Sequence, residues 1–142
     1  MSSVFTHRVR VRFYECDPQG VVWNANFLNY LDVAQTELMR VTRGPYAELA
    51  GTGIEVVMAE ARLRFLAPAR FDDEVDIELD LRRLGTTAMT TRMIVRREGA
   101  ELVEGEARYV YVDRDSGRKA PIPEKVRSSL EPYLTEESQA PT

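Results

Sequence analysis

A single helical pattern in an otherwise strand-like chain is the feature that most limits how this sequence can fold. Apolar residues recur at positions i, i+3, i+4, i+7, i+11 and i+14, the spacing that places side chains on one face of an α-helix. These residues are Phe27, Tyr30, Leu31, Ala34, Leu38 and Val41. Asn26 is the expected N-cap, because its side-chain oxygen can accept from first-turn N–H groups, and Gly44-Pro45 is expected to end the helix.

The rest of the chain is dominated by alternating apolar and polar residues, the period-two pattern of β-strands. The alternating stretches are residues 5–14, 59–67, 75–82, 89–96 and 103–111. Turn residues at Leu84-Gly85-Thr86 and Glu98-Gly99-Ala100 predict that the last three strands form consecutive hairpins. Each stretch has one apolar face, as expected for an antiparallel sheet that is covered on one side.

One helix and about five strands predict an α+β fold in which a curved antiparallel sheet wraps round one long central helix. We expect a single domain over residues 1–135, with a short helical stretch near its end, and a disordered polar tail over residues 136–142. Such a sheet has two free edges, and free edges invite pairing with another chain. We therefore expect a homodimer joined edge to edge, or a homotetramer.

The composition excludes several classes of protein. The net charge of −4 argues against a nucleic-acid-binding protein, which needs a basic face. No run of 18 apolar residues is present, so no membrane span is expected. The first eight residues lack the apolar core of a signal peptide, and a lone cysteine forms no internal disulfide. Both observations favour a cytoplasmic location.

The scarcity of histidine and cysteine limits the chemistry further. His7 and Cys16 are the only residues of their kinds, so no cluster of metal ligands is visible. The sequence contains no Gly-x-Ser-x-Gly elbow, no Gly-x-Gly-x-x-Gly and no Walker loop. We therefore expect neither a metal nor a cofactor.

Asp17 is the residue that points most directly to an activity. It stands in a Pro/Gly turn, Cys16-Asp17-Pro18-Gln19-Gly20, between the first predicted strand and the helix. A helix N-terminus presents unpaired N–H groups and the positive end of the helix dipole. A carboxylate beside such donors can attack a carbonyl whose oxygen they hold, or activate water against it. The segment therefore suggests acyl-transfer chemistry.

Simpler interpretations of the same residues remain open. An aspartate in a turn most often only hydrogen-bonds to the local backbone. Asn26 fits a helix cap better than a substrate ligand, and Trp23 alone fits a core or interface position. Cys16 is a poor candidate for the nucleophile, because no histidine partner stands near it in the sequence.

The stretch from Val11 to Arg40 resembles the 4-hydroxybenzoyl-CoA thioesterase family of hotdog-fold enzymes, including its Tol–Pal-associated acyl-CoA thioesterase branch. The matching residues are Cys16-Asp17-Pro18, Gly20, Val22-Trp23, Asn26, Leu31-Asp32 and Phe71-Asp72-Asp73. The resemblance implies a hotdog fold and hydrolysis of an acyl-CoA, with a short-chain or aromatic acyl group, to free acid and CoA. It also implies that Asp17 is the nucleophile or general base, and that backbone N–H groups near Asn24 polarise the thioester carbonyl.

The sequence departs from the family pattern at two places. The Tol–Pal branch usually has a histidine where this chain has Asn24, and the 4-hydroxybenzoyl type usually has an aromatic residue there, so only a backbone role carries over. The basic cluster that binds the CoA phosphates in the 4-hydroxybenzoyl type falls here on residues 85–87, which are Gly-Thr-Thr. Those contacts do not carry over, although Arg82 and Arg83 lie close by in the sequence.

Six residues around Asp17 are the expected substrate contacts. They are Gly20, Trp23, Asn24, Asn26, Tyr30 and Asp32. Trp23 and Tyr30, with Phe13, are expected to form an apolar wall for the acyl group, and Asp32 to reach a polar substituent on it.

Three other functions stay open: an acyl carrier protein thioesterase, a hotdog dehydratase and a non-catalytic acyl-CoA binding protein. Dehydratases of this fold pair a histidine with an acid, and the position of His7 outside the loop disfavours that function.

Overall fold

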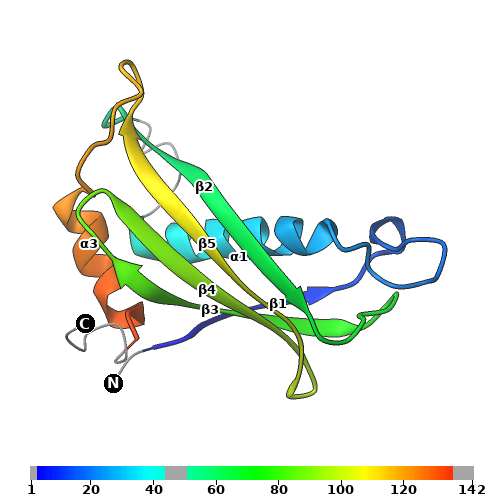
Figure 1. Ribbon diagram of the computed structural model, residues 1–142. Coiled ribbons are helices and arrows are strands. Elements are labelled where there is room, and N and C mark those ends of the chain that lie inside the picture. Colours follow the sequence, from blue (N-terminus) through cyan, green and yellow to red (C-terminus); the bar gives the residue numbers. More distant parts are fainter. Residues whose placement is uncertain (1–2, 44–50, 136–142) are drawn as a thin grey trace.

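Five antiparallel strands form one sheet, and the long helix α1 lies against one face of it. The computed structural model describes residues 3–43 and 51–135 (Figure 1). The strands follow the order β1-β3-β4-β5-β2 across the sheet. The elements are β1 (Phe5–Arg10), a 3-10 turn (Phe13–Glu15), α1 (Asn26–Arg43), β2 (Ile54–Phe65), β3 (Glu74–Leu84), β4 (Ala88–Arg97), β5 (Ala100–Asp113), α3 (Glu124–Leu130) and a second 3-10 turn (Glu131–Tyr133). The predicted fold class, including the consecutive hairpins β3-β4-β5, is confirmed.

The core lies between α1 and the inner face of the sheet, as the two periodicities predict. On α1 the buried apolar side chains are Phe27, Tyr30, Leu31, Ala34 and Leu38, whereas Val41 on the last described turns is 63% exposed. The alternating residues of β3, Val75, Ile77, Leu79 and Leu81, are fully buried. The predicted short helical stretch is α3, which buries Val126 and Leu130. The tail predicted over residues 136–142 lies outside the described residues.

β1 is shorter than the alternation predicts, and this difference creates the loop that carries Asp17. The strand ends at Arg10 instead of continuing to residue 14, and Phe13 is 78% exposed instead of belonging to the core. Val11 still exchanges backbone bonds with the turn before β3, through Asp73 O at 2.8 Å and Asp72 N–H at 3.0 Å. After Val11 the chain leaves the sheet and turns toward α1.

β2 is longer than predicted but poorly covered. It begins at Ile54 instead of residue 59, and its pairing with β5 is interrupted by a bulge between Met58 and Glu60. Met58 and Phe65, which pair with the buried Tyr109 and Val103 of β5, remain 42% and 46% exposed. The helix therefore covers the β3 side of the sheet more completely than the β2 side.

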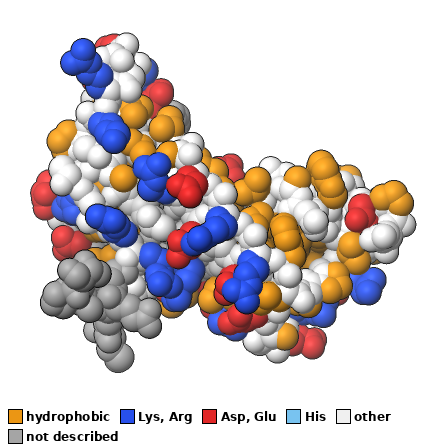
Figure 2. All heavy atoms as spheres, viewed as in Figure 1, with side chains coloured by type: hydrophobic (Ala, Val, Ile, Leu, Met, Phe, Trp, Pro, Cys, Tyr) orange, Lys and Arg blue, Asp and Glu red, His pale blue; other side chains and the backbone are white. Residues whose placement is uncertain are grey.

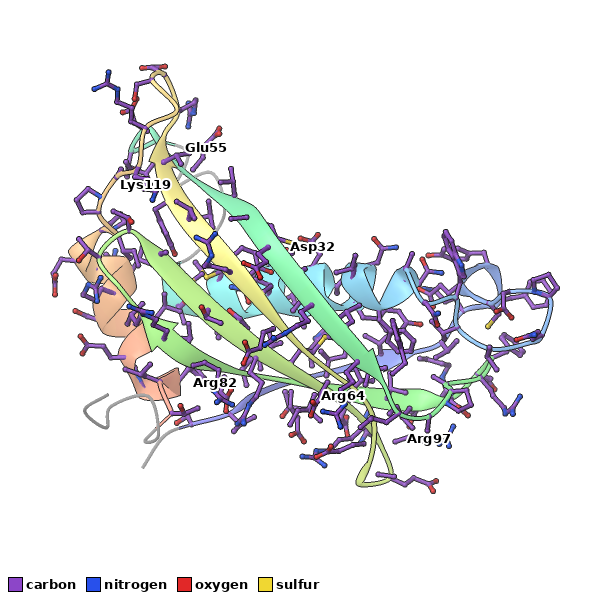
Figure 3. All side chains as sticks on the ribbon, in the orientation of Figure 1. Asp32, Glu55, Arg64, Arg82, Arg97 and Lys119 are labelled. Carbon is purple, nitrogen blue, oxygen red and sulfur yellow. The ribbon has the colours of Figure 1, made fainter. Side chains whose placement is uncertain are left out.

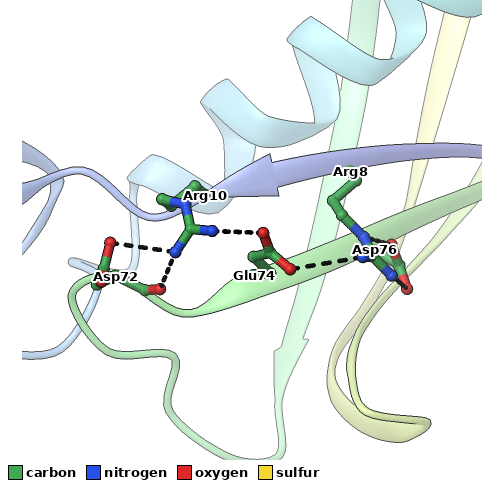
Figure 4. Close-up of polar contacts among 5 residues, drawn as sticks. All are labelled: Arg8, Arg10, Asp72, Glu74 and Asp76. Atoms are coloured by element: carbon green, nitrogen blue, oxygen red, sulfur yellow. Dashed lines mark hydrogen bonds and ion pairs between the residues drawn. The ribbon is translucent and has the colours of Figure 1, made fainter.

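The outer face of the sheet carries paired charges. Figure 2 shows basic and acidic side chains interleaved on the face turned to the viewer, and the ion pairs include Arg62–Glu106, Arg64–Glu104 and Arg96–Glu78. A second ladder joins the edge strand β1 to β3, where Arg8 and Arg10 bind Asp72, Glu74 and Asp76 (Figure 4). Exposed pairs of this kind add little stability each, but they match the register of neighbouring strands.

None of the helices in the described part of the chain is long and apolar enough to cross a membrane.

Gly105 of β5 occupies a place where the sheet leaves no room for a side chain. A Cβ atom there would lie 2.7 Å from the backbone oxygen of Arg62 and 2.6 Å from Leu63 Cδ2 on β2. Forcing extra atoms into a packed site costs about 1–3 kcal/mol. We therefore expect Gly105→Ala to lower the free energy of unfolding by about that amount, measured by urea denaturation.

The neighbouring Glu104→Ala is the control for this variant. Its ion pair with Arg64 is exposed, 74% and 42% on the two side chains, and should change the free energy of unfolding by less than about 1 kcal/mol. Equal midpoints for wild type and Gly105→Ala would contradict the close approach of β2 and β5.

Candidate active site

Asp17 lies at the tip of a small hairpin between β1 and α1. Cys16 and Val22 pair across this hairpin, and the Asp17 N–H donates to Val21 O at 2.8 Å. The tip is closed by a bond from Gly20 N–H to Asp17 O at 2.9 Å. Gly20 has φ +80°, a left-handed conformation that glycine adopts without strain. Gly20, expected as a substrate contact, therefore has a defined role in shaping the turn.

The Asp17 carboxylate is partly buried and has one backbone partner. Its Oδ1 accepts the N–H of Gln19 at 2.8 Å, the local bond typical of an aspartate in a turn. Within the described residues its Oδ2 accepts no hydrogen bond. The turn interaction and an available carboxylate oxygen thus coexist in the same side chain.

The first turn of α1 leaves two backbone donors free beside the hairpin. The N–H groups of Asn26, Phe27 and Leu28 donate to the carbonyls of residues 23, 24 and 25 at 2.8, 3.2 and 3.1 Å. The N–H groups of Asn24 and Ala25 come just before these and have no partner in the described part of the chain. They lie at the positive end of the helix dipole and can hold a negatively charged oxygen.

Asn26 differs from its predicted role as the N-cap. It is the first residue of α1, and its Nδ2 donates to the backbone oxygen of Glu15 at 2.8 Å. Its Oδ1 accepts from Asn29 Nδ2 at 2.9 Å instead of from a first-turn N–H. The helix begins with backbone i→i+3 bonds, so the side chain is free to fasten the helix to the hairpin.

Glu15 is a buried acidic residue at the base of this hairpin whose contacts the sequence reasoning missed. Only 5% of it is exposed, and its carboxylate accepts hydrogen bonds from Arg12 and from the Tyr30 hydroxyl. Burial, followed by the bond to Glu15, raises the pKa of Tyr30, and the same carboxylate raises the pKa of Arg12 through a hydrogen bond and charge attraction. The spacing of Arg12 and Glu15, three residues apart, was the available signal.

The remaining expected substrate contacts fall in different environments. Trp23 and Asn24 are exposed at the junction of hairpin and helix, with Trp23 at 59%. Tyr30, expected in the acyl wall, is 1% exposed and lies beneath the hairpin with its hydroxyl on Glu15. Asp32 is exposed on α1 (labelled in Figure 3), where its charge adds to the effect of burial in raising the pKa of Tyr109.

Exposed aromatic side chains surround the hairpin. Figure 2 shows hydrophobic side chains gathered over the end of the molecule that carries this loop. Phe13, Tyr14 and Trp23 are 78%, 78% and 59% exposed, and Phe71 packs edge-on against Phe13 at 5.8 Å between ring centroids. Phe13 and Tyr14 come just before the hairpin and Trp23 just after it, so these rings offer an apolar surface near its base.

Two other candidate groups are less suited to chemistry here. Burial, aided by the charges of Glu15 and Asp17, raises the pKa of the Cys16 thiol, and this disfavours the reactive thiolate. Arg82 lies toward the other end of the sheet from the hairpin (Figure 3), so one copy of the chain does not bring it to Asp17. Among residues 3–43 and 51–135, no three His, Cys, Asp or Glu side chains are placed to hold a metal ion.

A second turn supports the hairpin from outside. Val22 N–H donates to Ala69 O at 2.8 Å, and Val21 pairs with Arg70. The turn that contains Ala69 and Arg70, just before β3, is itself fixed by Asp73. The Oδ2 of Asp73 accepts hydrogen bonds from the Arg70 N–H at 2.9 Å and from Arg97 at 2.7 Å. Two side-chain carboxylates therefore hold the Asp17 hairpin: that of Glu15, at its base, and that of Asp73, in the neighbouring turn.

Architecture and site together define a hotdog-fold protein with a carboxylate loop at the start of its central helix. Comparison with known proteins supports this class. Residues 11–130 match the family model of the Thioesterase-like superfamily. The chain belongs to this superfamily of thioester hydrolases, and the resemblance drawn from Val11–Arg40 and Phe71–Asp73 is confirmed.

Individual relatives agree with this assignment. A putative esterase from Aquifex aeolicus is 31% identical over 126 residues, which cover 89% of this chain and 97% of the relative. The acyl-CoA thioester hydrolase YbgC from Escherichia coli is 28% identical, covering 88% and 94%. The solved structure of gentisyl-coenzyme A thioesterase BH1999 superposes with a TM-score of 0.80 at 26% identity, covering 88% of this chain and 98% of that one.

Asp73 should make stability depend on pH. Burial opposes its ionisation, but hydrogen bonds from the Arg70 backbone and from Arg97 outweigh burial and lower the pKa of Asp73. A lowered folded-state pKa adds stability above the unfolded value of about 3.9, and that stability is lost as the pH falls through the folded value. Asp73→Asn should therefore lose about 1–2 kcal/mol at pH 7 and less at pH 3, where part of this stabilisation has already gone, measured by urea denaturation at both values.

Asp72→Asn is the matched control. Its carboxylate pairs with Arg10 at a site that is 63% exposed, and asparagine tolerates the left-handed φ of +70° found there. A loss of stability in Asp73→Asn that is the same at pH 7 and pH 3 would contradict the lowered pKa.

Proposed function

We propose that this protein is an acyl-CoA thioesterase in which Asp17 is the catalytic carboxylate. The observation that carries the proposal is that a carboxylate held by the Gln19 N–H stands on the hairpin leading into α1, where two N–H groups have no partner among the described residues. Hydrolysis of a thioester needs a group that attacks the carbonyl carbon or activates water, and hydrogen-bond donors for the developing oxyanion. The naming of YbgC as an acyl-CoA thioester hydrolase supports CoA as the carrier.

Two routes use this geometry. In the first, an Asp17 oxygen attacks the thioester carbon, the CoA thiolate leaves, and water hydrolyses the mixed anhydride to regenerate the carboxylate. In the second, Asp17 takes a proton from water, the hydroxide attacks the carbonyl, and the tetrahedral intermediate expels the thiolate, which takes up the proton. In both, the N–H groups of Asn24 and Ala25 stabilise the oxyanion, each worth about 10²–10³ in rate by analogy with other acyl-transfer sites.

The exposed rings beside Asp17 support a short-chain or aromatic acyl group. Trp23 and Phe13 present flat apolar surfaces, and Leu28 on α1 is 38% exposed on the first turn of the helix. Asp32 is one turn beyond Leu28 and can accept a hydrogen bond from a hydroxyl on the acyl group. Gly20, Trp23, Asn24, Asn26, Tyr30 and Asp32 stay as the proposed substrate-binding set, Gly20, Asn26 and Tyr30 acting through the shape of the loop.

The alternative functions use the same loop. An acyl carrier protein thioester would present the same acyl group and carbonyl to Asp17. A dehydratase would need a histidine at the reacting carbon, whereas His7 stands in the β1–β3 ladder opposite Ile77. A non-catalytic acyl-CoA binding protein would bind the same ligand without turnover.

Free-thiol release from acetyl-, hexanoyl-, palmitoyl-, benzoyl- and 4-hydroxybenzoyl-CoA tests the proposed activity. We expect wild type to hydrolyse at least one of these, and Asp17→Asn to lose about two or more orders of magnitude in kcat because the attacking group is gone. Circular dichroism checks that the variant folds. Full activity in Asp17→Asn would remove Asp17 from the mechanism, and no turnover by wild type would favour the carrier protein or the non-catalytic function.

A pair of variants at Asn24 separates the side chain from the backbone. Asn24→Ala keeps the N–H and should retain kcat within about threefold, whereas Asn24→Pro removes the donor and should lower kcat by about 10²-fold. Proline is tolerated before the first turn of a helix, so the fold should survive. Equal losses in both variants would assign the role to the amide side chain instead.

We also propose that two copies of the chain join through β2. Both edge strands carry charged side chains, but β1 is only six residues long and bears Arg8 and Arg10, whereas β2 is twelve residues long and has the uncharged run Val56–Ala59. Val57 and Met58 in this run are 43% and 42% exposed. A homodimer with continuous sheets, or a homotetramer of such dimers, covers these side chains.

Sedimentation velocity tests this assembly. We expect wild type to sediment as a dimer or tetramer, and Val57→Lys to shift the distribution toward the monomer because a charged edge opposes pairing. Val41→Lys, at a 63% exposed position on α1, is the control and should leave the distribution unchanged. A monomeric wild type would reject the proposal.

A further inference from the structure

Glu15 is a buried acidic residue whose carboxylate and backbone oxygen together contact the segment after β1, the end of the hairpin and the start of α1. Charged side chains are seldom buried unless they are paired and hydrogen-bonded. The Oε1 of Glu15 accepts from the Arg12 backbone N–H at 2.7 Å and from the Tyr30 hydroxyl at 2.9 Å. Its Oε2 accepts from Arg12 Nε at 3.1 Å and Nη2 at 2.8 Å. One carboxylate therefore joins the segment after β1 to the second turn of α1.

The backbone oxygen of the same residue fixes the start of the helix. It accepts from the Trp23 N–H at 3.0 Å and from Asn26 Nδ2 at 2.8 Å. The free N–H groups of Asn24 and Ala25 lie between these two attachment points. Both of the attachments that flank these two N–H groups therefore use one carbonyl oxygen.

Asp17 is two residues further along the chain, on the same strand of the hairpin. Between them, Cys16 pairs with Val22, so the bonds at Glu15 and at Asp17 close the two ends of one short ladder. A shift of the Glu15 main chain would move the Asp17 carboxylate and the oxyanion donors relative to each other. Misplacement by about 1 Å can cost about 10²-fold in rate.

We propose that Glu15 is the positioning residue of this site, holding the Asp17 carboxylate and the Asn24 and Ala25 N–H groups in their relative arrangement through its carboxylate and its carbonyl oxygen. The inference rests on the proposed role of Asp17. The competing explanation is that Glu15 stabilises the fold in general, as any buried carboxylate paired with an arginine can.

Asp80 provides the matched control for that explanation. It is also 5% exposed and binds an arginine side chain, with Arg92 Nε at 3.0 Å from its Oδ1. It lies on β3, outside the hairpin and the helix start. Asp80→Asn should therefore lower the free energy of unfolding without changing kcat.

The experiment compares Glu15→Gln, Tyr30→Phe and Asp80→Asn with wild type in two measurements. Hydrogen–deuterium exchange of residues 16–24 reports the hairpin without any need for turnover. Steady-state kinetics with the best acyl-CoA of the panel reports kcat and KM at a temperature where all variants are folded. Tyr30→Phe removes only the hydrogen bond from the Tyr30 hydroxyl to the Glu15 carboxylate. It replaces Glu15→Gln in the comparison if that variant fails to fold.

Support requires faster exchange confined to residues 16–24 in Glu15→Gln, with kcat lowered by about 10–100-fold and KM within about twofold. Tyr30→Phe should show the same pattern at smaller size. Unchanged local exchange, or a loss of kcat no greater than that in Asp80→Asn, would overturn the proposal. Asp17→Asn is measured alongside to test the proposed role of Asp17 separately. If Asp17→Asn keeps full activity while exchange is still faster in Glu15→Gln, the role of Asp17 is rejected but the ordering of the hairpin by Glu15 is not.

Discussion

The packing of one helix against a five-stranded sheet is the constraint from which the rest of this structure follows. The described part of the chain has no second long helix, so α1, helped at one end by the short α3, must bury most of the inner side chains of β3, β4 and β5. It does so on the β3 side and leaves Met58 and Phe65 of β2 partly exposed. The N-terminus of the helix extends to the end of the sheet where β1 leaves it, and the candidate site forms at this junction (Figure 1).

Periodicity predicted the parts of the fold that depend on burial. The alternation in β3 and β4 and the helical spacing from Phe27 to Leu38 each specify one apolar face, and the structure buries those faces. Periodicity failed where hydrogen bonds of side chains decide the path of the chain. Phe13 continues the alternation of β1 but is exposed, because the chain turns at Arg12 toward Glu15. The sequence likewise did not show that β2 is an edge strand, since edge strands and central strands can have the same alternating pattern.

The sequence predicted where the Asp17 turn and the start of the helix lie, but not the residues that hold them in place. Asp17 and the helix start can be recognised from the order of turn, glycine and amphipathic helix. In the sequence, Glu15 has the pattern of an ordinary polar loop residue. Its burial depends on a contact with Tyr30, fifteen residues away. Asn26 was expected to cap its own helix, whereas it binds a carbonyl eleven residues back. Contacts of this kind join segments that no local pattern relates.

The tightness of the Asp17 turn also limits how proteins built this way can diverge. Two backbone bonds close the turn over Asp17, Gly20 and Val21, and a third joins Trp23 to Glu15. An inserted or deleted residue would displace the carboxylate from the helix start, so the length of this loop cannot be used to accommodate new substrates. Under the proposed function, changes of substrate preference would arise instead from side chains that border the loop without holding it, such as Trp23, Asn24 and Asp32. Under the proposed function, chemistry and selectivity would thereby be divided between residues that hold the turn and residues that only border it.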